Sequence, residues 1–171
     1  MFNTKKYVLI SLLISQAIVL SIIERSIPTP FLTPGAKLGL ANIIIIISIY
    51  FLNIREAFLV LILRIILVSM FGGSISSLLY SISGGILSFI SMALMYILFN
   101  KKISIIVLSI MGALMHNIGQ LITASIMVNT NLMTYYMPLM FCASIPTGLF
   151  VGLASSLLLK HIEKIKLHIK I

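Results

Sequence analysis

Apolar residues fill most of the chain in six segments, which are separated by short polar or turn-forming stretches. The segments run at about residues 7–23, 37–52, 57–71, 77–99, 103–128 and 135–159. The stretches between them read ERSIPTPFLTPG, NIRE, GGSIS, NKK and VNTNLMT, and they hold residues that interrupt helices. Because a helix of about 20 residues crosses the hydrocarbon core of a bilayer, the pattern predicts six transmembrane helices. The second and third segments are short for this purpose, and we expect them to borrow flanking residues.

The second segment contains an unusual transition, from a polar opening to an isoleucine run, in TPGAKLGLANIIIIISIYF. In water, Ile43–Ile47 would favour a strand, but an isolated strand leaves its backbone unsatisfied in lipid, so we predict a helix. We expect the isoleucines to face lipid and packing partners. Lys37 and Asn42, in the polar opening, are expected to face a cavity near the outer rim. For Lys37, an equal alternative is that its side chain extends to the membrane interface without contacting a ligand.

The composition agrees with a membrane protein. The chain has 171 residues, of which 60% are hydrophobic and 9% charged, with a mean hydropathy of +1.21. We therefore predict a single integral membrane domain over residues 1–171, multi-pass in the cell membrane. The N-terminal apolar stretch Tyr7–Ile23 is longer than the core of a secretory signal, so we interpret it as a retained first span. The net charge of +9 does not indicate nucleic-acid binding, because the basic residues collect between apolar segments.

The distribution of Lys and Arg predicts the orientation, because such residues favour the cytoplasmic side. An N-terminus inside the cell leaves only Arg25 and Lys37 outside. The cytoplasmic side then holds Lys5, Lys6, Arg55, Lys101, Lys102, Lys160, Lys164, Lys166 and Lys170. We predict that both termini are cytoplasmic. The tail KHIEKIKLHIK could continue the sixth helix or lie on the anionic inner leaflet.

Several kinds of chemistry lack the residues that they need. The chain has no Asp, so it cannot form a Ser-His-Asp triad or an Asp-rich site that holds Mg²⁺ on a diphosphate. Its glycine-serine stretches lack the lysine of a phosphate-binding P-loop. His116 is separated in depth from His161 and His168, and Cys142 is the only cysteine, so we expect no metal site and no disulfide. We predict a protein that is not an enzyme and has no cofactor.

Arg64 is the most unusual polar residue, because it lies in the apolar stretch FLVLILRIILVSMF. It follows Glu56 by eight residues, which places it about 12 Å into the third span, near the middle of the membrane. An arginine at this depth is costly unless it faces a cavity, a partner or an anion. It is a candidate for ligand binding, and the structural alternative is a pairing with Glu24 or with backbone carbonyls.

Other polar residues fall in the outer half of the predicted bundle. His116, Asn117 and Gln120 lie at spacings of three and four, so they share one face of the fifth helix. For His116 alone, a hydrogen bond between helices is an equal alternative. Tyr80, near the outer end of the fourth helix, could contribute a hydroxyl group.

Together these residues predict a pocket that opens outward and favours an anionic small molecule. Glu24 and Arg25 are expected at its rim, and the proline-rich loop from Glu24 to Gly35 is expected to cover it. The predicted ligand-binding residues are Lys37, Asn42, Arg64, Tyr80, His116, Asn117 and Gln120.

Four stretches, ERSIPTPFLTPGAKLGLANI, AFLVLILRIILVSMFGG, LYSISGG and HNIGQL, together resemble one family of small membrane proteins. These are the Gx transporters, also labelled heptaprenyl diphosphate synthase component I. The likeness covers about Glu24 to Ser155, and its most specific part is PGAKLGLAN followed by HNIGQ. The family is similar to the substrate-binding S components of energy-coupling factor (ECF) transporters.

The resemblance implies a six-helix bundle that captures a vitamin or a precursor outside the cell. S components work with a transmembrane coupling subunit and two ATPases, and they usually dock through alanines four apart in the first helix. Here only Ser11 and Ser15, and Ala17 and Ser21, have that spacing. Such small-residue pairs, including Gly148 and Gly152, also serve internal packing.

The two family labels give two hypotheses. The first is a substrate-binding membrane component of a small-molecule transporter. The second is a non-catalytic membrane component associated with heptaprenyl diphosphate and isoprenoid-quinone synthesis, because soluble prenyl synthases use the Asp-rich motifs that this chain lacks. A membrane anchor or scaffold for an electron-transfer complex is a third interpretation.

Overall fold

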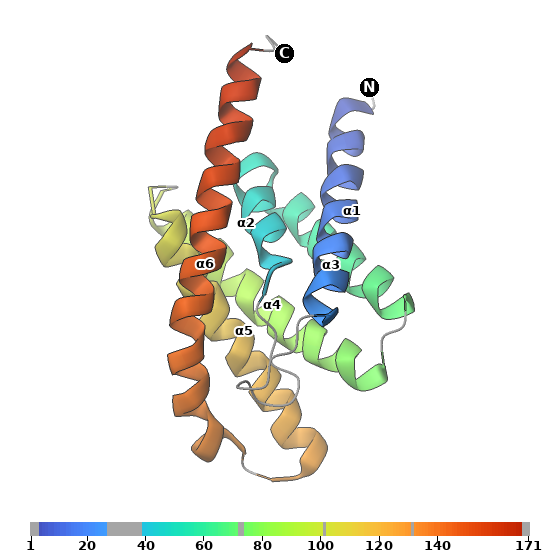
Figure 1. The fold of residues 1–171 in the computed structure, drawn as a ribbon, viewed down its shortest axis with the longest axis vertical. Coiled ribbons are helices and arrows are strands. Elements are labelled where there is room, and N and C mark those ends of the chain that lie inside the picture. Colours follow the sequence, from blue (N-terminus) through green and yellow to red (C-terminus); the bar gives the residue numbers. More distant parts are fainter. Residues whose placement is uncertain (1–3, 27–38, 72–73, 101, 131, 169–171) are drawn as a thin grey trace.

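The structure is a computed structural model, and it describes residues 4–26, 39–71, 74–100, 102–130 and 132–168. These residues form six helices and no strand (Figure 1). The helices are α1 (Thr4–Ser26), α2 (Asn42–Phe51), α3 (Ile54–Met70), α4 (Ile75–Leu98), α5 (Ile105–Val128) and α6 (Leu132–His168). In the described part of the chain, α1, α4, α5 and α6 are each long and apolar enough to cross a membrane. The predicted all-α class is confirmed, and the chain is a multi-pass membrane protein.

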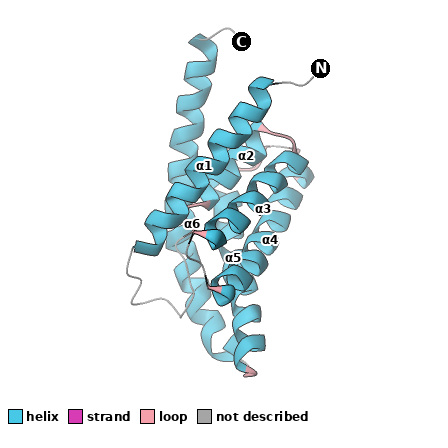
Figure 2. Cartoon of the chain, turned by 90° about the vertical axis from the view of Figure 1, so that its right-hand side faces the viewer, coloured by secondary structure: helices cyan, strands magenta, loops and turns pink. Residues whose placement is uncertain are grey.

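The helices form one bundle (Figure 2), in which α5 packs most extensively, against α4 and α6. The first turn of α1 and the last turn of α6 lie at the same end of the molecule (Figure 1). We call this end the terminal end. The arrangement is consistent with an even number of crossings, while the side of the membrane that each end faces stays a prediction.

The short helix α2 lies at the centre and contacts each of the other five helices. It has ten residues, a length of about 15 Å, which is half of a bilayer core. The predicted span 37–52 was therefore wrong in length: residues 39–41 precede the helix, and residues 37 and 38 lie outside the described part. The isoleucines do not face lipid either, since Ile43–Ile47 are each at most 6% exposed. A helix that is apolar on every side can be buried on every side, as α2 is.

The limits of α1, α3, α4 and α5 lie within three residues of the predicted ones, whereas α6 is longer than predicted. The third helix, α3, has 17 residues and a length of about 25 Å. The sixth helix, α6, has 37 residues and runs through the basic tail to His168. The tail therefore continues the sixth helix, which was one of the two alternatives.

Glycines allow the backbones of α4, α5 and α6 to approach closely. A Cβ added at Gly119 of α5 would lie 2.6 Å from the carbonyl oxygen of Ser83 in α4. A Cβ added at Gly148 of α6 would lie 2.6 Å from the Cα of Ile110 in α5. The small-residue pair Gly148 and Gly152 therefore serves internal packing, because Gly152 also faces the α5 backbone at Ile106.

Gly119→Ala should lower the stability of the bundle, because backbone atoms of α4 would have to move. Overpacking of this kind costs about 1–3 kcal/mol. Gly85→Ala is the matched control, because the atoms nearest to its added Cβ are the side-chain ends of Ile65 and Leu61. Thermal unfolding in detergent would measure both variants, and equal losses of stability would contradict this account.

An ion pair joins α1 to α3 near the terminal end. The Lys6 ammonium group contacts the Glu56 carboxylate, which also accepts a hydrogen bond of 3.2 Å from the backbone N–H of Asn53. Glu56 is in the first turn of α3, outside the predicted span. The hydrogen bond from Lys6 lowers the pKa of Glu56 below its ordinary value.

This lowered pKa predicts how the stability depends on pH. The ionised Glu56 contributes stability above the ordinary carboxyl pKa of about 4.3, and the contribution is lost as the pH falls through the lowered pKa. An exposed pair contributes about 0–1 kcal/mol, so Glu56→Gln should reduce the thermal midpoint slightly at pH 7 and not at all in strong acid. Lys6→Met should have the same effect at pH 7; a difference between wild type and Glu56→Gln that persists in acid would contradict the assignment.

Candidate ligand pocket

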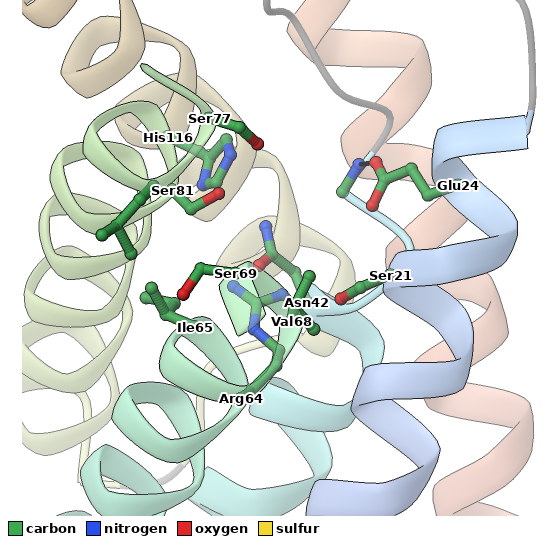
Figure 3. Close-up of a pocket in the computed structure, with 12 residues that line it drawn as sticks. Ser21, Glu24, Asn42, Arg64, Ile65, Val68, Ser69, Ser77, Ser81 and His116 are labelled. Carbon is green, nitrogen blue, oxygen red and sulfur yellow. Dashed lines mark hydrogen bonds between the residues drawn. The ribbon is translucent and has the colours of Figure 1, made fainter. Parts of the chain in front are cut away.

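A polar pocket lies where α2 begins, between α1, α3, α4 and α5 (Figure 3). Its volume is about 500 Å³, including its open mouth. The lining residues are Ser21, Glu24, Gly39, Asn42, Arg64, Ile65, Val68, Ser69, Ser77, Leu78, Ser81 and His116.

Arg64 supplies the positive charge of this pocket. Its side chain is 7% exposed, and it has no hydrogen bond and no direct ion pair with any described residue. A guanidinium group carries five N–H donors, and burying it without partners is costly. The structural alternative was a direct pairing of Arg64 with Glu24 or with backbone carbonyls. Arg64 does not form such a pairing with the described residues. The guanidinium lies beside Asn42 in the pocket (Figure 3).

Glu24 lies near the end of α1 and fixes the start of α2. Its carboxylate accepts a hydrogen bond from the backbone N–H of Gly39. Gly39 has a φ of +79°, a conformation that favours glycine. Glu24 is buried and interacts electrostatically with Arg64 across the pocket. The last turn of α1 therefore holds the turn from which α2 begins.

The first residue of α2 is Asn42, which is buried inside the bundle. The turn before it is closed by hydrogen bonds from the N–H of Asn42 to Gly39 and from the N–H of Ile43 to Leu40. The N-terminal end of a helix carries a partial positive charge, which favours anions. Here this end points into the protein interior rather than into water, and Arg64 lies beside it. Both features favour a negatively charged group in the pocket.

A second cavity lies on the other side of the start of α2, between α2, α4, α5 and α6. It has a volume of about 320 Å³, including space that is open to solvent, and shares Gly39, Asn42 and His116 with the first pocket. Its other lining residues are Ile46, Met92, Ser109, Gly112, Ala113, Asn117, Thr147 and Val151.

The three polar residues predicted on one face of α5 have different surroundings. All three are buried. His116 lines both cavities, and Asn117 lines the second, where its amide donates a 2.8 Å hydrogen bond to the Ser144 hydroxyl of α6. Gln120 lines neither; it packs against Gly84 of α4, and its amide oxygen and nitrogen have no hydrogen-bond partner among the described residues.

The remaining predicted residues are not brought into the pocket by the described part of the chain. Tyr80 is on α4 but does not line either cavity. Lys37 lies outside the described residues, as does most of the predicted covering loop. Arg25 belongs to α1, but its side chain is not described. The structure therefore brings together Glu24, Asn42, Arg64 and His116. Among the described residues that line the pocket, the positive charge of Arg64 is balanced by the negative charge of Glu24, so the predicted surplus of positive charge is not seen there.

Of the serine hydroxyls in the pocket, that of Ser81 was considered from the sequence, and three others were not predicted. Ser21 of α1, Ser69 of α3 and Ser77 of α4 all line it. Ser77 and Ser81 are four residues apart, so their shared face could have been found from the spacing. The described residues contain no group of three or more His, Cys, Asp or Glu side chains that could hold a metal ion.

Replacing Gln120 should raise the stability of the ligand-free protein. A buried amide without partners costs about 1–3 kcal/mol, so Gln120→Met should increase the thermal midpoint in detergent. Asn117→Leu is the contrasting variant, because it removes the hydrogen bond to Ser144 and should lower the midpoint. A loss of stability in Gln120→Met would show that its amide has a partner.

The comparisons with known proteins give one match. The family model described as heptaprenyl diphosphate synthase component I matches residues 13–158. Neither the curated proteins nor the solved structures contain a match to the chain.

Proposed function

The chain belongs to the heptaprenyl diphosphate synthase component I family, and we propose that it is the substrate-binding membrane component of a small-molecule transporter. In this proposal the pocket at Arg64 opens to the outside of the cell and captures a small molecule with an anionic group, of the size of a vitamin or its precursor. Asn42 and His116 supply hydrogen bonds to it. Lys37, Tyr80, Asn117 and Gln120 remain predicted ligand-binding residues, with Glu24 and Arg25 at the rim.

The observation that carries the proposal is the buried guanidinium of Arg64, which has no direct partner among the described residues and lies beside the start of α2. Structural arginines in membranes pair with carboxylates or carbonyls. A guanidinium that lines a pocket instead offers its donors to an anion, and carboxylate and phosphate groups fit these donors in pairs.

The proposed orientation has six crossings and cytoplasmic termini. It is supported by basic side chains that are exposed in the segments predicted to be cytoplasmic, at Arg55, Lys102, Lys160 and Lys164. The terminal end would then be cytoplasmic, and α2 would reach from the cytoplasmic side to about the middle of the membrane. Its N-terminal end and Arg64 would be reached from outside.

Transport would need partners, which we propose to be a coupling subunit and ATPases of the ECF type. Ser11 and Ser15 are exposed on α1, and their hydroxyls already donate to carbonyls of their own helix. A partner helix could therefore pack on this small-residue pair without leaving a hydroxyl unsatisfied. Ala17 is fully buried, so the second small-residue pair is not available for docking.

A second candidate is a non-catalytic membrane component of heptaprenyl diphosphate synthesis. The description of the matched family favours it, since it names a component of that synthase. Co-purification distinguishes the two candidates: the second predicts a soluble prenyl synthase as the partner, and the first predicts a coupling protein and ATPases.

Ligand retention tests the first candidate. Purified protein is denatured, and the small molecules that it releases are measured by mass spectrometry. Arg64→Met should lose about 90% or more of an anionic compound held by the wild type, because a charged hydrogen bond contributes about 1.5–3 kcal/mol. Arg55→Met is the matched control, since it removes an exposed arginine far from the pocket, and it should retain the compound. Equal retention by Arg64→Met would overturn the proposal.

A further inference from the structure

Ser109 of α5 is a buried hydroxyl that the folded chain leaves unsatisfied. The residue is 2% exposed and lines the second cavity. Its hydroxyl oxygen has no hydrogen-bond partner among the described residues. An unsatisfied buried hydroxyl destabilises a protein, so its presence needs an explanation.

Ser88, Ser125 and Ser155 also have buried hydroxyls without a partner among the described residues, but none of these three lines either cavity. Other serines of the bundle do have partners. The hydroxyl of Ser48 donates to the Ile44 carbonyl at 2.7 Å, and that of Ser91 donates to the Ser88 carbonyl at 2.8 Å. Such bonds to the preceding turn are the usual solution for a serine in a membrane helix. Ser109 has a preceding turn in α5 as well, but no such bond is formed.

Asn117 of α5 and Thr147 of α6, which also line the second cavity, already have partners. The Asn117 amide donates to Ser144, and the Thr147 hydroxyl donates to the Ala143 carbonyl at 2.9 Å. Asn42 resembles Ser109, because its side-chain amide has no hydrogen bond to a described residue and lines both cavities. Polar side chains without a hydrogen bond to a described residue thus extend from Arg64 through Asn42 to Ser109.

The two cavities are adjacent, because their shared wall consists of Gly39, Asn42 and His116. Gly39 has no side chain, and its N–H is turned to Glu24. A ligand that crosses from the first cavity into the second along the start of α2 would have its ends in different chemical surroundings.

We infer that the ligand has two parts: an anionic group at Arg64 and a neutral part, carrying a hydroxyl, carbonyl or amide, that bonds to Ser109 in the second cavity. The inference rests on the proposed function and adds the substrate class to it. It makes Ser109 a specificity-determining residue. Alkyl acids and other anions without a polar second part bind more weakly, because they leave Ser109 unsatisfied.

The experiment uses full-length protein in mild detergent, and the probe is the set of small molecules that the wild type releases on denaturation. Mass spectrometry measures their amounts in wild type, Arg64→Met, Ser109→Ala and Ser91→Ala. Ser91→Ala is the matched control, because Ser91 is a buried serine whose hydroxyl already has a partner. Thermal unfolding of the stripped proteins is measured in parallel.

An anionic compound with a neutral polar group should be retained about tenfold less by Ser109→Ala and be lost from Arg64→Met, whereas Ser91→Ala should retain it. The stripped Ser109→Ala protein should unfold at or above the wild-type temperature, because the substitution removes an unsatisfied hydroxyl. If Ser109 had only a structural role, Ser109→Ala would lower both the amount of retained compound and the unfolding temperature of the stripped protein.

Three results would overturn the inference. If the compound depends on Arg64 but not on Ser109, the proposed function stands and the inference fails. The inference also fails if both serine variants lose the compound equally, or if the retained compound is a simple alkyl anion. If no released compound depends on Arg64, the proposed function and the inference fail together.

Discussion

Hydrocarbon offers no hydrogen bonds, so each polar group inside a membrane protein depends on partners supplied by the protein, by water or by a ligand. The position of α2 follows from this constraint. Its ten residues are too few to cross a bilayer core, and its N-terminal end borders a polar pocket inside the bundle instead of lipid. The same arrangement brings Glu24, Asn42 and Arg64 together, since the turn at Gly39 is held by α1 and faces α3. A half-length helix thereby creates a polar site in an apolar bundle.

Close packing of α4 and α5 shapes the other wall of this site. At Gly84 an added Cβ would lie 2.9 Å from the His116 carbonyl oxygen and 3.1 Å from Cε1 of its ring. A side chain at this position would push His116 away from both cavities. At Gly112 an added Cβ would meet the sulfur of Met92 at 2.6 Å, so this glycine leaves room for Met92 beside the second cavity. The glycines at which the helices meet also determine where the side chains that line the cavities lie.

Hydropathy alone predicts the number and the approximate limits of the helices, because each apolar segment in the described chain becomes one. It cannot predict that α2 is central, since Ile43–Ile47 are equally suited to lipid and to protein neighbours. Arg64 could be found because charge is rare in such a segment. Helical spacing grouped His116, Asn117 and Gln120, but spacing defines a face and not its neighbours, and Gln120 packs against Gly84 instead of lining either cavity. Ser109 could not be found from sequence, because serines in apolar helices usually bond to their own backbone.

The electrostatics of the pocket depend on Glu24 as much as on Arg64. Among the described lining residues these two are the charged ones, and they face each other across the pocket without a direct ion pair (Figure 3). The hydrogen bond to Gly39 keeps the Glu24 carboxylate on the α1 side. An anionic group that reaches Arg64 therefore enters the field of a buried carboxylate, which weakens its binding relative to an isolated arginine. A ligand that carries more than one hydrogen-bonding group offsets this repulsion through contacts away from Glu24, and the second cavity lies on that side of α2.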